Sequence, residues 1–110
     1  MSLTLGSNGT TSALVIGAET VLTTDNTNAF FTFVFDTSNM VIGDVLVARI
    51  YTAVSNGGAL IQAWEASFGP SPQVNNAKIS MGVPSIWSLK CTLTQTAGTG
   101  RTFPWELLRI

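Results

Sequence analysis

Histidine is absent from this sequence of 110 residues, and cysteine occurs once. Without histidine the chain has no imidazole general base, no Ser–His or Cys–His catalytic pair, and none of the imidazole ligands that most zinc sites use. The lone Cys91 has no partner for an intrachain disulfide, which excludes a cystine-stapled secreted module. We therefore expect no catalytic residues, no metal site and no bound cofactor.

Charge is also scarce. Lys, Arg, Asp and Glu make up 10% of the chain, against about 25% in ordinary soluble domains. Binding to nucleic acid or to an anionic membrane needs clustered basic residues, whereas those of this chain are scattered: Arg49, Lys78, Lys90, Arg101 and Arg109. A surface made mainly of Ser, Thr, Asn and Gln carries little repulsion against association. We therefore expect other protein to cover part of it, and neither nucleic acid nor membrane as a partner.

Long hydrophobic runs are missing as well. No segment approaches the roughly 18 consecutive apolar residues of a membrane helix. The first residues, MSLTLGSNGTTSALVIG, lack the basic start of a signal peptide.

What the chain does contain is a series of strand patterns rich in Thr, Val and Ile. The clearest is AFFTFVFD, residues 29–36, in which Phe31, Phe33 and Phe35 share one face. Because the other face, with Phe30 and Val34, is also largely apolar, we expect this strand to lie centrally in a sandwich.

A hairpin is predicted in the middle of the chain. The long strand 44–54 is followed by Asn56-Gly57-Gly58, and Asn-Gly between apolar runs is a strong hairpin signal because both residues tolerate positive φ. The next run, 59–68, has apolar spacing that fits a strand or a helix. We favour a strand, because the turn requires a partner for 44–54.

The remaining pattern gives strands over 13–16 with 21–22, over 78–83, over 86–95 and over 102–110, with loops over 37–44, 69–76 and 96–101. In 86–95 we expect Trp87, Leu89, Cys91 and Leu93 to face inward and Ser88, Lys90, Thr92 and Thr94 to face water. The glycine-rich 96–101 predicts a hairpin turn that packs 102–110 back onto 86–95. Pro104 has no N–H for a ladder and would mark an edge strand or a bulge.

About eight strands separated by turn signals predict an all-β fold. We expect residues 1–110 to form one antiparallel β-sandwich domain of the jelly-roll kind. The chain ends on apolar residues up to Ile110, so we expect that end to be sheltered by the domain's own core or by a neighbouring chain.

Candidate sites for chemistry are few. Asp36 and Asp44 flank one loop and could approach each other as a glycosidase pair, although turn formation is the more frequent role of such residues. DNTN, residues 25–28, is rich in oxygen ligands but lacks the glycine and distal glutamate of an EF-hand. Cys91 alternates with apolar residues and reads as a buried thiol. The tryptophans Trp64, Trp87 and Trp105 occupy inward positions, which favours core packing over stacking on sugars.

Contact with a partner is predicted at both ends of the chain. The apolar segment Met1 to Ser7, with Leu3 and Leu5, could add to the sheet edge of another chain or pair within its own domain. Arg101 and Arg109 bracket the last strand. They could pair with acids of a neighbour or act as solvated charges that discourage edge aggregation. The candidate partner interface is therefore Met1, Leu3, Leu5, Arg101, Arg109 and Ile110.

Two stretches, GDVLVARIYTAVSNGG and TLTQTAGTGRTFPWELLRI, resemble small structural proteins of tailed bacteriophages, in which an AGT turn and an Arg precede a closing aromatic–Trp strand. The resemblance covers about two-thirds of the chain, from Asp44 onward. It implies a non-enzymatic auxiliary capsid protein, of the decoration or cement type. Such a protein binds across subunits of the major capsid protein on the outer surface of the virion. It would be made in the cytoplasm of the bacterial host and act as a homo-oligomer, dimer or trimer.

Two other functions stay open at this point. A tail, neck or fibre component would share the sequence character but occur in few copies per virion. A small carbohydrate-binding module would expose an aromatic side chain, a tryptophan or Tyr51, in a groove beside Asn, Asp or Gln. An enzyme is the least favoured class, because it would need two carboxylates that converge in a pocket.

Overall fold

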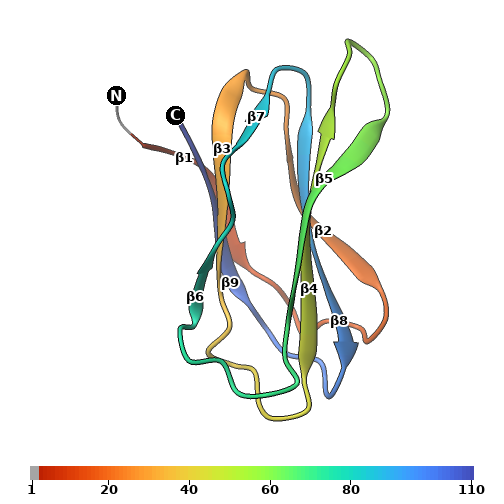
Figure 1. Ribbon diagram of the computed structural model, residues 1–110, viewed down its shortest axis with the longest axis vertical. Helices are drawn as coiled ribbons and strands as arrows, with labels where there is room; N and C mark the ends of the chain where they lie inside the picture. The colour runs from red at the N-terminus through yellow and green to blue at the C-terminus, as the bar shows by residue number, and fades with distance from the viewer. Residues whose placement is uncertain (1–2) are drawn as a thin grey trace.

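The structure is a computed structural model that describes residues 3–110. These residues form nine strands and no helix, arranged as two antiparallel sheets that lie side by side as two layers (Figure 1). The predicted all-β sandwich is confirmed. The strands are β1 (Thr4–Thr10), β2 (Glu19–Asp25), β3 (Ala29–Asp36), β4 (Val45–Ala53), β5 (Leu60–Phe68), β6 (Ala77–Ile79), β7 (Val83–Ser85), β8 (Leu89–Ala97) and β9 (Pro104–Arg109).

The strand pairings are nested around the central hairpin. β4 pairs with β5, β2 with β8 and β1 with β9, while β6 and β7 both pair with β3. Sheet A has the order β1-β9-β3-β6, and β7 pairs with β3 along the same edge as β6 but at the other end of that strand. Sheet B has the order β2-β8-β4-β5. The turn at 56–58 therefore sits at the centre of the chain's pairing scheme, and Gly57 adopts the positive φ of 72° that the predicted hairpin requires.

The core lies between the two sheets and follows the predicted alternation. Phe31, Phe33 and Phe35 of β3 are buried against Leu46 and Ile50 of β4 and against apolar residues of β8 and β9. Each such side chain contributes on the order of 1.5–3 kcal/mol of transfer free energy. β3 also has neighbours on both sides, β9 on one and β6 with β7 on the other, as expected of a central strand.

The last strand corrects the sequence prediction. β9 does not return onto β8; it lies in the opposite sheet, between β1 and β3. Residues 98–103 thus connect the two sheets instead of forming a hairpin turn. Pro104 is neither at an edge nor in a bulge. It is the first residue of a central strand, a position where the missing N–H interrupts the ladder least.

Three other segments differ from the expectation. Residues 13–16 are a loop rather than a strand, because the chain crosses there from sheet A to sheet B, with Leu14 buried at the crossing. The predicted strand 78–83 is divided into β6 and β7. β8 begins at Leu89, so Trp87 precedes the strand and is 41% exposed instead of facing inward.

The outward-facing side chains of β8 are also more buried than the alternation predicts. Thr92 and Thr94 are buried, although the alternation placed them in water. β8 lies between β2 and β4, and the long side chains of these neighbours reach over it. Glu19 of β2 accepts a hydrogen bond from Thr92, and Arg49 of β4 donates one to Thr94. Periodicity gives the face of a residue but not what its neighbours place above it.

Candidate functional site

The outer face of sheet A carries an unusual set of side chains. Residues of β1, β9, β3, β6 and β7 that point away from sheet B form four rows across the sheet, which we call the A face. The first row, at the C-terminal end of β9, consists of Ile110, Phe30 and Pro84, and the second of Leu5, Leu108 and Thr32. The third row consists of Asn8, Glu106, Val34 and Ile79, and the fourth of Thr10, Pro104, Asp36 and Ala77. Eight of these fourteen residues, the first two rows with Val34 and Ile79, have no charged side chain.

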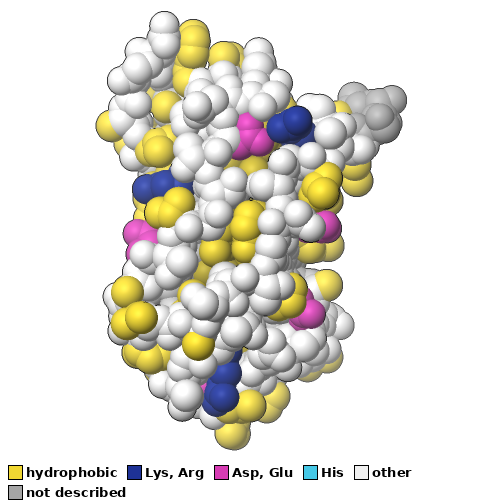
Figure 2. Space-filling view, turned by 180° about the vertical axis from the view of Figure 1, so that it is seen from behind, with side chains coloured by type: hydrophobic (Ala, Val, Ile, Leu, Met, Phe, Trp, Pro, Cys, Tyr) yellow, Lys and Arg dark blue, Asp and Glu magenta, His cyan; other side chains and the backbone are white. Residues whose placement is uncertain are grey.

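Large apolar side chains on the A face are open to solvent. Leu5 is 50% exposed, Phe30 and Ile110 are each 47% exposed, and Ile79 is 67% exposed. Leu3, which is 62% exposed, precedes β1 and continues the alternation of Leu5. Hydrophobic side chains also reach the surface at many places when the molecule is seen from behind, where charged groups are few and far apart (Figure 2). A contiguous exposed apolar surface on a sheet face is a candidate site for contact with other protein.

The structure brings together three of the six residues predicted to contact a partner. Leu3, Leu5 and Ile110 lie at the same end of the A face, because β1 and β9 are paired from Thr4 with Arg109 onward. From Thr4, the N-terminal segment thus pairs within its own domain. Met1 lies outside the described residues.

The A face contains further residues that the sequence prediction missed. Phe30, Leu108, Val34 and Ile79 complete its apolar part, and Glu106 its acidic part. The available signal was the alternation in 29–36 and in PWELLRI, which leaves Phe30 and Leu108 on the side opposite the core.

A groove of about 640 Å³ lies over the third and fourth rows of the A face. Its polar lining consists of Asn8, Thr10, Asp36, Ser38, Asn76 and Glu106, and its apolar lining includes Val34, Pro104 and Trp105. No lysine or arginine lines it. Asp36 lies opposite Pro104 and Glu106 opposite Val34, so the two carboxylates are diagonal neighbours on adjacent strands, with Cα atoms about 7–8 Å apart.

The outer face of sheet B has a different character, because its charges compensate one another. Arg49 Nε donates to Glu65 Oε1 at 2.7 Å, and Arg49 Nη1 lies 3.7 Å from Glu19 Oε2. Tyr51 and Thr92 both donate to Glu19 at 2.6 Å. Burial would raise the pKa of Glu19, but these hydrogen bonds and the nearby cations outweigh it and lower the pKa. Lys90 lies over the Tyr51 ring, 4.4 Å from its centroid.

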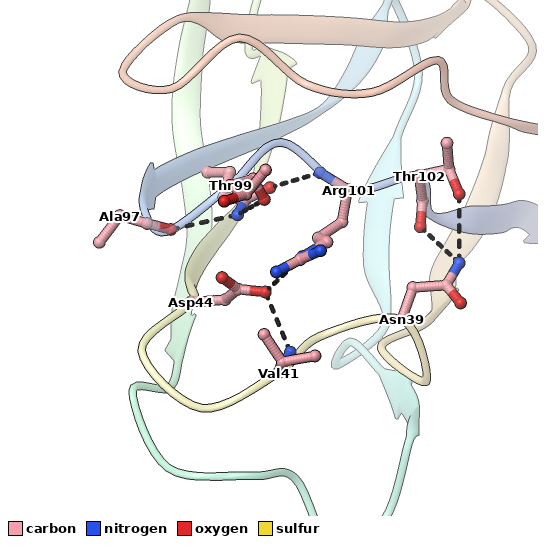
Figure 3. A network of polar contacts seen from close by, with 8 residues as sticks. Asn39, Val41, Asp44, Ala97, Thr99, Arg101 and Thr102 are labelled. Atoms are coloured by element: carbon pink, nitrogen blue, oxygen red, sulfur yellow. Dashed lines mark hydrogen bonds and ion pairs between the residues drawn. The ribbon is translucent and has the colours of Figure 1, made fainter.

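Arg101 is part of a polar network that closes one end of the sandwich (Figure 3). Its Nε donates to Asp44 Oδ2 at 2.9 Å, and the Val41 amide donates to the same oxygen at 3.0 Å. The Asp44 side chain is only 1% exposed. Burial raises its pKa, but the hydrogen bonds from Val41 and Arg101, the charge of Arg101 and the Thr99 amide prevail, so the net pKa is lowered. Arg101 therefore pairs with an acid of its own chain, whereas the sequence predicted either an acid of a neighbouring chain or a solvated charge at a sheet edge.

Arg109 is likewise engaged within the chain. Its Nη1 lies 3.1 Å from Asp25 Oδ2 and 3.3 Å from Thr27 Oγ1. Asp25 Oδ1 accepts from the Thr27 amide at 2.8 Å. The carboxylate of the DNTN loop therefore takes part in a turn and in an ion pair. Within residues 3–110 there is no group of three or more His, Cys, Asp or Glu side chains placed to hold a metal ion.

The remaining candidates for chemistry lie apart from one another. Asp44 is buried in its ion pair, whereas Asp36 lines the groove and accepts hydrogen bonds from the backbone and hydroxyl of Ser38, so the two do not form one site. Cys91 is buried as predicted, and burial, with a smaller effect of Asp25, raises the pKa of its thiol to about 12.

The three tryptophans lie in different surroundings, and one of them reaches the groove. Trp64 and Trp105 pack against the core, as predicted. The exposed Trp87 lies instead in a second hollow, of about 240 Å³, beside Val54, Pro84 and Ile86. Trp105 also lines the first groove beside Asn8, Asn76 and Asp36, so a half-buried aromatic lies next to the amide and carboxylate side chains expected of a carbohydrate module.

Comparison of the chain with protein-family models, with curated proteins and with solved structures gives no match. Among residues 3–110 there is no helix long and apolar enough to cross a membrane.

Proposed function

We propose that this protein is a non-enzymatic structural component of a phage virion that decorates the capsid and binds across subunits of the shell. One observation carries the proposal: the A face presents a contiguous apolar surface, while the outer face of sheet B is closed by its own ion pairs. A protein that exposes an apolar sheet face is suited to lie against other protein.

The topology gives further support. If β6 and β7 count as one interrupted strand, the chain has eight strands that pair first with eighth, second with seventh, third with sixth and fourth with fifth. A long hairpin folded over in this way is a jelly roll, and we propose that assignment here. Jelly rolls occur in viral capsid proteins and also in lectins and cupins, so the fold agrees with the proposal without requiring it.

The proposed action is mechanical. A standard interface buries about 1,600 Å² in total. A decoration protein repeats such a contact at every equivalent position of a shell. Because a shell subunit can leave only by breaking several contacts together, many contacts of moderate strength add up to a large resistance to internal pressure. Such a role needs no catalytic group, and it suits a chain in which four of the six carboxylates are held in ion pairs.

Copy number tests the proposal. The native assembly that contains the chain would be purified, and the chain would be quantified against the most abundant co-purifying protein. We expect a ratio near one, or a simple fraction such as one-half or one-third. A handful of copies per particle would assign the protein to the tail, neck or fibre. A chain that purifies alone as a monomer would contradict a structural role, and glycan binding would then be measured.

A further inference from the structure

The carboxylates within residues 3–110 are held in ion pairs, except at one place. The ion pairs there engage Glu19, Asp25, Asp44 and Glu65. The two other carboxylates of the chain are Asp36 and Glu106, and neither is in an ion pair with a described residue. Both line the groove of the A face. Of the six Asp and Glu side chains of the chain, the two that form no ion pair among residues 3–110 thus lie in one hollow.

The groove selects the charge of what could enter it. Carboxylates, amides and hydroxyls line it, and no lysine or arginine does. Phosphate, nucleic acid and acidic glycans would meet negative charge there. A guanidinium or ammonium group would find acceptors on two adjacent strands, and Arg in particular can bind two carboxylates with its fixed set of donors.

The acidic groove and the apolar rows are one continuous surface. Val34 lines the groove and pairs with Ile79, while Glu106 is two residues from Leu108 on the same side of β9. Strands lie about 4.8 Å apart and same-side residues about 6.8 Å apart, so the four rows cover roughly 400 Å². That is about half of the ~800 Å² that one partner buries in a standard interface. Pro84 extends the surface into the second hollow, beside Ile86 and Trp87.

We infer that the A face docks a different polypeptide, which lays apolar side chains on the rows around Leu108 and Phe30 and inserts a Lys or Arg side chain between Asp36 and Glu106. The inference rests on the proposed function and specifies the chemistry of the shell segment that is bound. A second copy is a poorer occupant, because in a two-fold contact its A face would bring the same two acids. Lys78 and Lys90, the cations without an ion pair among the described residues, lie against Phe68 and Tyr51 instead.

Charge reversal tests the acidic half of the surface. Glu106→Lys and Glu106→Gln would be compared with wild type for binding to the assembly with which the wild-type chain co-purifies, at several salt concentrations. Glu65→Lys and Glu65→Gln on sheet B are the matched controls. We expect Glu106→Lys to weaken binding roughly tenfold or more, Glu106→Gln to weaken it less and to reduce its salt dependence, and both controls to bind like wild type.

Ile79→Ser tests the apolar half, with Val21→Ser on β2 as its control, since both side chains are more than half exposed. We expect only Ile79→Ser to lose affinity. Equal thermal melting of each variant and wild type would show that the loss is not one of folding, and Glu106→Gln, which keeps size and shape, serves if Glu106→Lys melts earlier.

The outcomes separate the two proposals. If wild type assembles and the variants of Glu106 and Ile79 bind equally well, the docking inference is wrong and the structural role stands. If wild type does not assemble, the proposed function fails. If isolated wild type forms a dimer that Glu106→Lys or Ile79→Ser abolishes, the occupant is a second copy, and a different partner is ruled out for this face.

Discussion

Asp44 illustrates, at the scale of single residues, how this protein uses its few charges. The carboxylate joins the loop before β4 to the segment before β9 through Val41 and Arg101, which are far apart in sequence from each other. Gln95 binds the same segment, since it donates to the carbonyls of Ala97 and Thr99 and accepts from the Arg101 amide. The network fixes the crossing from sheet B to sheet A.

Arg101→Ala is expected to destabilise the fold by about 3 kcal/mol, because it leaves the buried Asp44 carboxylate without its counter-charge. Urea unfolding monitored by tryptophan fluorescence measures the loss. Lys90→Ala, which removes a cation that has no ion pair among residues 3–110, is the control and should change stability by at most about 1 kcal/mol, the worth of its contact with the Tyr51 ring. A loss below about 1 kcal/mol for Arg101→Ala would mean that the backbone amides alone hold Asp44.

Cys91 is expected to be unreactive in the folded protein. Burial raises its thiol pKa to about 12, so almost no thiolate exists near pH 8, and the side chain is fully covered. Ellman's reagent should react with native protein only at the rate of unfolding, and at once in denaturant. Immediate stoichiometric reaction of the native protein would contradict the buried assignment.

At the scale of elements, the turn between β4 and β5 holds these two strands, the innermost pair of the nested pairing, in register. Gly57 adopts a φ of 72°, and an added Cβ would meet no atom within 4 Å, so only backbone strain limits substitution there.

Gly57→Val is therefore expected to cost roughly 1–2 kcal/mol, whereas Gly57→Asn, which tolerates the left-handed region, should cost distinctly less. Thermal melting of the two variants against wild type measures the difference. Equal melting temperatures for Val and Asn would show that the turn rearranges and does not set the register.

At the scale of the whole molecule, the two sheet faces differ in the fate of their charges. The outer face of sheet B is closed by pairs within the chain, and that of sheet A is apolar with two uncompensated acids. This difference, rather than any single residue, is the reason why we propose sheet A as the interaction surface.

Between pH 3 and pH 8, stability is expected to fall only toward the acid end. The pKa values of Glu19, Asp25 and Asp44 are lowered in the fold from ordinary values of 4.5, 3.8 and 3.8. The unfolded chain thus takes up protons before the folded one, so their stabilisation is complete above about pH 5.5 and is lost as the pH falls through the lowered pKa values. With no histidine, the urea midpoint should be constant between about pH 6 and 8.

The urea midpoint measured from pH 8 to pH 3 tests this expectation, with Asp44→Asn as a variant whose midpoint should depend less on pH below 5. A clear change between pH 6 and 8 would contradict it, because it would require a titrating group with a pKa near neutrality.

The sequence by itself determined the features that depend on neighbours along the chain. The alternation of Phe31, Phe33 and Phe35 and the turn at 56–58 predicted β3, the hairpin and the sandwich, because side-chain period and turn chemistry are local. It also indicated three residues of the A face, Leu3, Leu5 and Ile110, through their apolar character at the ends of the chain.

Tertiary structure alone decided which strands are neighbours. β9 follows β8 in the chain yet lies in the other sheet, so Arg101 and Arg109 meet Asp44 and Asp25 instead of solvent or another chain. These pairings depend on how two sheets close over a common core, which no local pattern encodes. Only once the pairs are assigned do Asp36 and Glu106 remain as uncompensated charges, because compensation is a property of the folded whole.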